Sequence, residues 1–342
     1  MSSEIFERCA AAVIGTEDVC RVCPVTGNGA RAVCDDGSTL LDFASGSVTG
    51  WGDKEVARAI SEQAGKLTCA GPCATESAAE YASRLLFMTS CDSLIFAHDR
   101  KSVIGSAVRL AHAYSKTRYG EGRDGVLFAG DDVSMLMASV GSACALVFEP
   151  IDLENSCPQD EDRLCELFTF AAENDLLTIA DETCTGIFRS GSVTACAKYE
   201  LMPDLLLLSG GLAGGLPLSV CLVRGEASRV CIEADAGDPI TCAAARCVLD
   251  KAGALAKNGN IEAASKRMEA AFRQCRNIYD VRTLGLMASF SVDGDAAVCR
   301  RRLASAGLLT AQKNDRVLLL PPLCVNNEEI DGAAEIIDRV LK

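Results

Sequence analysis

The chain has 342 residues, of which 49% are hydrophobic and 23% are charged, a balance typical of a folded protein with a large core. Its formal net charge of −14 argues against nucleic-acid binding, which needs a basic face, and against binding to anionic membranes. No apolar run is long enough to span a membrane, and the N-terminal segment does not read as a signal peptide. We therefore expect a cytoplasmic protein.

Three helices are predicted in the first third of the chain from the spacing of apolar residues. They cover residues 53–66, residues 76–88 behind an N-cap at Thr75, and a third stretch around 103–114. Short apolar runs follow, with a helix at about 160–174 between the second run and the third. These runs predict strands near residues 125–130, 144–150, 176–181, 205–208 and 219–223.

The pattern changes after residue 224. Long helical stretches cover about 240–275, and the remaining part reads as a strand, a helix, an apolar run and a final helix. These elements lie at 284–292, at about 295–306, at 316–322 and from Asn327 onward.

Continuous apolar strands separated by helices predict an α/β fold with a mostly parallel sheet buried on both faces. We expect a large domain over residues 46–235 and a smaller α/β domain over 236–342, which the N-terminal segment 1–45 joins.

The 19 cysteines are scattered without the spacing of a disulfide framework, so we expect reduced thiols. One alternative remains, in which Cys20, Cys23, Cys69 and Cys73 supply thiolates to zinc or to an iron–sulfur cluster. The unequal spacing of the two pairs argues against it, and we expect no metal. Metal analysis of the purified protein would decide between these interpretations.

Asp181 ends the apolar run at 176–181, and ligands of open parallel sheets bind beyond the carboxyl ends of the strands. An aspartate there can pair with the protonated ring nitrogen of an electron-sink cofactor. The alternative is an acid that caps the following turn.

Several segments occur in the order found in one family: ADETCTGIFRSG at 180–191, PDLLLLSGGLAGGLPLS at 203–219 and VLLLPPLCVNNEEID at 317–331. With CALVFEP at 144–150 and DPITCAAARCVLD at 238–250, the chain resembles the class III pyridoxal-phosphate-dependent aminotransferases of the acetylornithine and ornithine type. The resemblance implies fold type I, with a large domain built on a mostly parallel seven-stranded sheet. It also implies a homodimer with sites at the subunit interface and amino transfer through a lysine Schiff base.

The resemblance also exposes departures from the family pattern. Gly210 aligns with the Schiff-base lysine, and no lysine occurs between Lys198 and Lys251. Asp99 and Arg100 align with the serine and glycine of the phosphate-binding loop, although the same stretch also reads as a solvated loop. The aromatic segment that stacks on the cofactor is shortened, and three further family positions carry other residues, which are Cys184 for a glutamine, Ala234 for a threonine and Leu318 for an arginine.

We therefore expect a catalytically inactive homologue that acts by binding, with no cofactor. Asp181, Thr183 and Cys184 are its predicted vestigial cofactor-binding residues. Its predicted partners are a second copy in a homodimer or an active paralogue in a heterodimer, and a small-molecule ligand. The alternative is a working enzyme. It is either an aminotransferase of the acetylornithine or ornithine type that uses pyridoxal phosphate, or a protein in which Lys101, Cys184 or Ser209 performs other chemistry.

Overall fold

The structure is a computed structural model that describes residues 4–13, 23–130 and 133–342. The chain divides into two compact units, each with its own sheet. The larger unit comprises Glu55–Leu153 and Cys157–Ala254, and the smaller comprises Met1–Lys54, Glu154–Ser156 and Leu255–Lys342. The divisions fall near residues 54 and 254, whereas the sequence placed them at 45 and 235. The division at 254 falls inside α8 (Pro239–Lys257), so most of this helix belongs to the larger unit.

The larger unit is built on a six-stranded sheet in the order β4-β11-β10-β9-β6-β5. Strand β11 pairs antiparallel with both neighbours and the other neighbouring pairs are parallel, so the expected mostly parallel sheet is confirmed. The expected count was seven, and this sheet has six among the described residues. Its strands are β4 (Ser93–Ala97), β5 (Gly125–Phe128), β6 (Ala143–Phe148), β9 (Leu177–Glu182), β10 (Leu205–Leu208) and β11 (Ser219–Val223).

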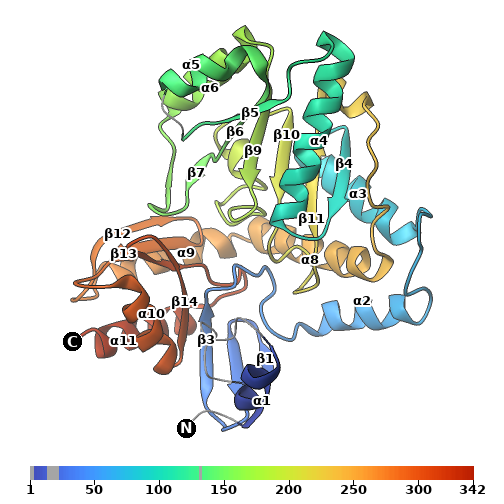
Figure 1. Ribbon diagram of the computed structural model, residues 1–342. Helices are drawn as coiled ribbons and strands as arrows, with labels where there is room; N and C mark the ends of the chain where they lie inside the picture. The colour runs from blue at the N-terminus through green and yellow to red at the C-terminus, as the bar shows by residue number, and fades with distance from the viewer. Residues whose placement is uncertain (1–3, 14–22, 131–132) are drawn as a thin grey trace. The chain divides into compact units, whose positions relative to one another are not determined.

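Helix α4 (Arg100–Tyr119) crosses one face of this sheet, where it contacts β4, β6, β10 and β11 (Figure 1). Its buried stripe, which includes Val103, Ala107 and Leu110, has the helical spacing seen in the sequence and packs on apolar strand residues. Asp99 caps the N-terminus and Gly120 ends the helix. The unit's other helices are α2 (Lys54–Ala64), α3 (Glu76–Thr89), α5 (Val133–Ser139), α6 (Glu161–Glu173), α7 (Ala195–Lys198) and α8. A short hairpin joins β7 (Ile151–Asp152) to β8 (Cys157–Pro158).

The smaller unit contains a seven-stranded sheet in the order β1-β2-β3-β14-β15-β13-β12. Only β3 and β14 pair in parallel among its described strands. These strands are β1 (Pro24–Asn28), β2 (Arg31–Cys34), β3 (Thr39–Phe43), β12 (Tyr279–Leu284), β13 (Met287–Ser291), β14 (Leu308–Lys313) and β15 (Arg316–Leu319). Its helices are α1 (Glu4–Ala12), α9 (Asn260–Phe272), α10 (Ala296–Ser305) and α11 (Asn327–Val340).

Most predicted elements form where the sequence placed them, and Thr75 caps α3 by accepting a hydrogen bond from the Ala78 amide. The helical stretches predicted at about 240–275 are two helices, α8 and α9, and the chain adopts φ +74° at Gly259 just before α9 begins. Several strands were not predicted from the sequence: β1, β2 and β3 near the N-terminus, β4, the short β7 and β8, β12 and β14. Among the described residues, no helix has the length and apolar character needed to cross a bilayer.

Candidate functional site

Asp181 lies near the carboxyl end of β9 and is buried, with 8% of its surface exposed. Its Oδ1 accepts hydrogen bonds from the amide and the hydroxyl of Thr183, at 3.0 and 2.6 Å. Its Oδ2 accepts a 2.7 Å hydrogen bond from Nη2 of Arg100. This carboxylate therefore shapes the turn after β9, as one interpretation expected, and it pairs with a cation of the chain itself. Its pairing with a cofactor ring stays a prediction.

Arg100 is the first residue of α4, and its guanidinium links the ends of two strands. Besides Asp181, Nη2 lies 3.4 Å from Oε1 of Glu149, the residue that follows β6. The pKa of Arg100 is raised above its usual value, chiefly by the hydrogen bond to Asp181. The sequence allowed two interpretations of Arg100, as part of an altered phosphate-binding loop or of a solvated loop. Neither predicted this contact, because the partner is 81 positions away in the chain and only the register of the sheet brings the two together.

The N-terminus of α4 is occupied by its own cap. Asp99 accepts a 2.7 Å hydrogen bond from the Ser102 amide, and the Ser102 hydroxyl accepts one from the Asp99 amide at 2.9 Å. These hydrogen bonds lower the pKa of Asp99, so its carboxylate is ionised at neutral pH. A helix N-terminus attracts anions, and here a carboxylate of the chain itself takes that place.

Gly210 follows Ser209 just beyond β10, whose Leu207 pairs with Asp181. Its backbone has φ +69°, a region that residues with side chains enter at a cost. A Cβ atom built there would lie 3.4 Å from the Thr183 carbonyl oxygen, so Gly210 adjoins the turn that Asp181 shapes. The Ser209 hydroxyl is 2.6 Å from that of Ser219 and so already has a hydrogen-bonding partner.

The lysines nearest to Gly210 in the chain have other contacts. Lys198 donates to the Ser190 carbonyl at 2.9 Å, and Lys251 pairs with Glu55 at 3.2 Å. Lys101 lines a separate, open groove along α4 with Arg109 and Asp235.

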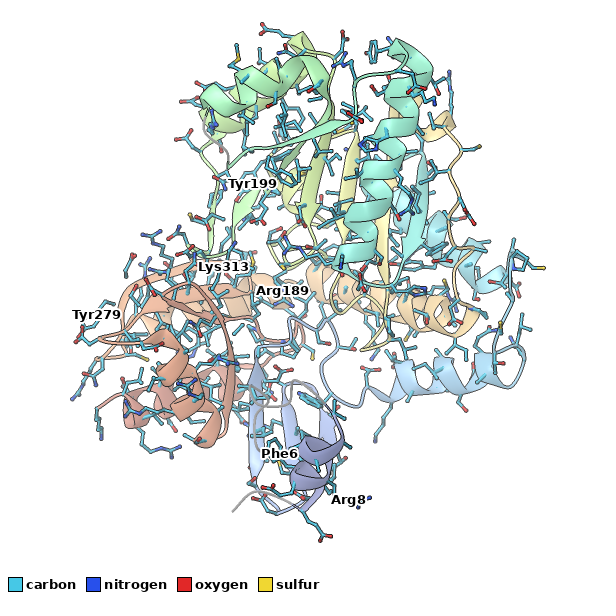
Figure 2. The ribbon with its side chains drawn as sticks, in the orientation of Figure 1. Phe6, Arg8, Arg189, Tyr199, Tyr279 and Lys313 are labelled. Carbon is cyan, nitrogen blue, oxygen red and sulfur yellow. The ribbon has the colours of Figure 1, made fainter. Side chains whose placement is uncertain are left out.

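Cys184 follows the same turn, and a reactive thiol there would need a lowered pKa. Arg100 does lower it, but the loss of water around the sulfur raises it more, so the pKa of Cys184 lies above its usual value. Neighbouring Glu182 is fully buried and accepts hydrogen bonds from the amides of Ala195 and Cys196, which is a structural role. Arg189, labelled in Figure 2, is also buried.

No contact joins the remaining sequence candidates to Asp181 among the described residues. Ala234 is exposed in the extended segment before α8, and Leu318 is buried in β15 of the smaller unit. Cys20 lies outside the described residues. Within the described ranges, no three histidine, cysteine, aspartate or glutamate side chains are grouped so as to hold a metal ion.

A cavity of about 380 Å³ opens beside Asp181 and Arg100. It is bounded by the first turns of α4 and α6 and by the ends of β5 and β6. The connection from β5 to β6, where the resemblance places a shortened segment, forms one side of it through Phe128, Ala129 and Gly130.

Pyridoxal phosphate, the cofactor implied by the resemblance, does not fit these residues. Its ring nitrogen would need the carboxylate that Arg100 holds, and its phosphate would meet Asp99 at the helix N-terminus. The resemblance places the lysine for its aldehyde at Gly210, which has no amine.

Known proteins match this chain along most of its length. Residues 131–341 match the family model described as "Aminotransferase class-III". The acetylornithine aminotransferase of Haemophilus ducreyi is 26% identical over 92% of this chain and 92% of its own length. The enzyme of the same name from Caldanaerobacter subterraneus subsp. tengcongensis is 28% identical over 93% and 94%.

Two solved structures share the fold. The acetylornithine aminotransferase of Elizabethkingia anophelis superposes with a TM-score of 0.86 at 22% identity and covers 98% of both chains. The ornithine delta-aminotransferase of Plasmodium falciparum gives 0.87 at 20% identity, over 99% of this chain and 98% of that one. The expected fold type I is thereby confirmed.

Proposed function

This chain belongs to the class III aminotransferase family, and from the geometry of its cleft we propose that it is a member that binds a small molecule without catalysing amino transfer. The observation that carries the proposal is the 2.7 Å ion pair between Arg100 and Asp181. The guanidinium takes the place in which the resemblance expects the protonated ring of the cofactor. The Asp181 side chain is only 6% exposed, so solvent screens this ion pair only partly. A ligand that displaced Arg100 would therefore have to offer Asp181 an equally good cation.

Two further features support the proposal. Gly210 offers no amine and no base at the end of β10, so neither a Schiff base nor a proton transfer has a residue to perform it there. Asp99 places a negative charge where a phosphate would bind.

We also propose that the protein works as a pair, either with a second copy or with an active relative as a regulatory subunit. The support is the resemblance to a family of dimers. Light scattering on the protein, alone and mixed with a relative that has the lysine, gives the mass of each assembly.

A second candidate is an active aminotransferase of the acetylornithine or ornithine type. The observation that favours it is the likeness to enzymes of that name over more than nine tenths of the chain. This function would require an amine from a lysine elsewhere in the sequence, and displacement of Arg100 from Asp181.

A pyridoxal-phosphate titration tests the proposal. We expect the purified protein to show no saturable imine absorbance and no lysine adduct after borohydride trapping, because the residues around Asp181 supply no amine. The matched variant combines Gly210→Lys with Arg100→Gly, and we expect it to trap the cofactor on the introduced lysine. Saturable trapping on any lysine of the unaltered protein, with amino transfer from acetylornithine or ornithine to a 2-oxo acid, would establish the second candidate.

A further inference from the structure

We infer that the cavity beside Asp181 binds a small apolar monocarboxylic acid. This inference rests on the proposed function, because it assigns a class of ligand to the cleft that the cofactor does not fit. The cavity is lined by residues at the ends of β5 and β6 and in the first turns of α4 and α6. Its volume of about 380 Å³ suits a ligand of the size of a substituted benzene ring.

The walls of the cavity are mainly apolar. One aromatic wall is held in place, since the ring of Phe148 packs edge-on against Phe168 with the centroids 5.3 Å apart. A second ring, Phe128, is 49% exposed at the end of β5, so a flat apolar body can cover it. The apolar lining residues are Ile104, Phe128, Val147, Phe148, Leu164 and Leu167. Binding of a flat apolar ligand there removes apolar surface of both the ligand and the cavity wall from water.

Most of the polar groups of the lining that remain without a hydrogen-bonding partner are donors. Arg100 uses Nη2 for Asp181 and Glu149, while its Nε and Nη1 donate to no acceptor among the described residues. Nη1 of Arg163, on the first turn of α6, lies 3.7 Å from Oε2 of Glu166, which is beyond hydrogen-bonding distance. A guanidinium presents its donors as a fork that matches the two oxygens of a carboxylate.

The acids that line the cavity are already used. Both oxygens of Asp181 accept hydrogen bonds, and Glu149 lies against the same guanidinium. An amine ligand would therefore have to compete with Arg100, which is tethered to the chain, whereas a carboxylate meets open donors. The geometry thus favours an acid over an amine of the same shape.

The experiment uses the whole purified protein and three ligands of one shape. Calorimetric titration compares phenylacetate with its neutral amide, phenylacetamide, and with the cation 2-phenylethylamine. We expect phenylacetate to bind and the other two to bind at least about tenfold more weakly, the range expected for hydrogen bonds to a charged group. Arg163→Gln should weaken phenylacetate by about the same factor, and Arg163→Lys, which retains the charge without the fork, by less.

The matched control is Arg118→Gln, which removes one arginine from the surface of the same unit. Arg118 is 50% exposed and pairs with Glu226, as Arg163 is 37% exposed and lies near Glu166. Equal affinity of the Arg163→Gln and Arg118→Gln variants, preference for the amine or the amide, or no phenylacetate binding at millimolar concentration would each overturn the inference. The proposed function fails differently, through a trapped cofactor in the preceding titration.

Discussion

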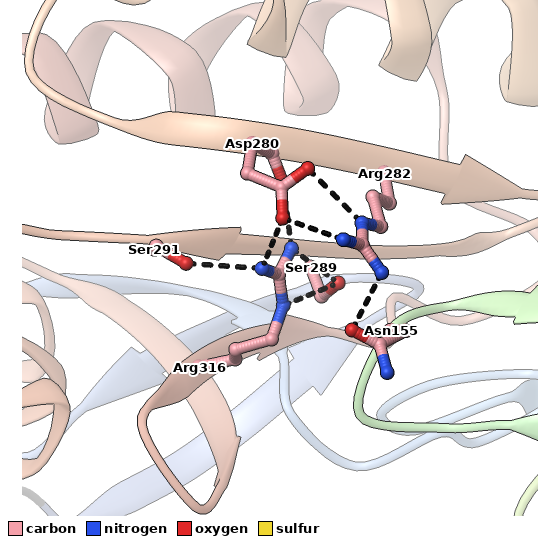
Figure 3. A network of polar contacts seen from close by, with 6 residues as sticks. All are labelled: Asn155, Asp280, Arg282, Ser289, Ser291 and Arg316. Carbon is pink, nitrogen blue, oxygen red and sulfur yellow. Dashed lines mark hydrogen bonds and ion pairs between the residues drawn. The ribbon is translucent and has the colours of Figure 1, made fainter.

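Arg316 shows what a single buried side chain does in the smaller unit (Figure 3). From β15 it donates to the hydroxyls of Ser289 and Ser291 on β13 and to the carboxylate and carbonyl of Asp280 on β12. Its side chain is 8% exposed, so these contacts replace its water almost completely. Arg282 shares the Asp280 carboxylate and also donates to Asn155 at 2.6 Å. Three strands are joined by one network.

Asp280 gives this network a pH dependence. The hydrogen bond from Arg282, and then those from Arg316, hold its pKa below the usual 3.8. A carboxylate with a lowered pKa stabilises the fold at every pH above its unfolded value, and the stabilisation is lost as the pH falls through the folded value.

We therefore expect Asp280→Asn to destabilise the protein at pH 6, by about 1 kcal/mol since the carboxylate is half exposed, and to have a smaller effect at pH 3. Urea unfolding at both pH values measures this difference. The control is Asp315→Asn, an exposed acid of the adjoining turn, for which we expect little change at either pH. A constant difference between the Asp280 variant and the parent across this range would contradict the prediction.

At the scale of the element, the glycine-rich turn between β10 and β11 serves close packing. Gly214 has φ +64°, and a Cβ atom there would lie 2.7 Å from a methyl carbon of Val56 on α2 and 3.7 Å from one of Val248 on α8. The turn therefore fits between two helices only because this position has no side chain. Gly214 is thus the position of this turn at which the close approach requires glycine.

Gly214→Ala should cost about 2–4 kcal/mol, the sum of left-handed strain and of overpacking against a stiff β-branched side chain. Gly215→Ala is the matched control, because Gly215 also has a positive φ, of +102°, but a Cβ atom there would meet nothing within 4 Å beyond its chain neighbours. We expect about 1–2 kcal/mol from strain alone there. Thermal unfolding of both variants measures the contrast, and equal losses would show that Val56 does not resist the added methyl group.

At the scale of the whole molecule, the cysteines differ in how far they are buried, and burial sets their reactivity. The structure places 18 of them as free thiols, and no disulfide occurs among these. Burial raises the pKa of Cys144 and Cys299 to about 11 and that of Cys242 and Cys275 to about 12. Since the thiolate is the reactive form, these four stay protonated and inert at neutral pH.

Brief treatment of the folded protein with iodoacetamide should therefore label the exposed cysteines first. We expect peptide mass spectrometry to find adducts on Cys9, Cys69, Cys73, Cys165 and Cys231 well before the four buried thiols. Cys184 is also exposed, but its raised pKa should make it react later than these five. Labelling in urea provides the reference in which all sites react. Early modification of Cys242 or Cys275 in the folded protein would show that α8 or the α9 end opens readily.

Much of the architecture could be predicted because apolar spacing is local. The stripe of α4 and the continuous apolar runs of β6, β9 and β10 are visible in consecutive residues. Other strands, among them β4 and β12, could not be predicted in this way. In β4 the burial is uneven, and β12 is half exposed with its register shifted between Tyr279 and Arg282, so neither has a clear alternation.

By itself, the sequence determined the order of the elements, the strand at whose end Asp181 lies, and the presence of a glycine where the family resemblance implies a lysine. These features depend on neighbouring residues, and hydrophobic spacing or motif order reveals them. Only the tertiary structure decided that Arg100 reaches Asp181 and Glu149, and that a cavity with open guanidinium donors lies beside them. Such contacts join residues far apart in the chain, and they depend on strand register and on the rotation of α4, which no local pattern encodes.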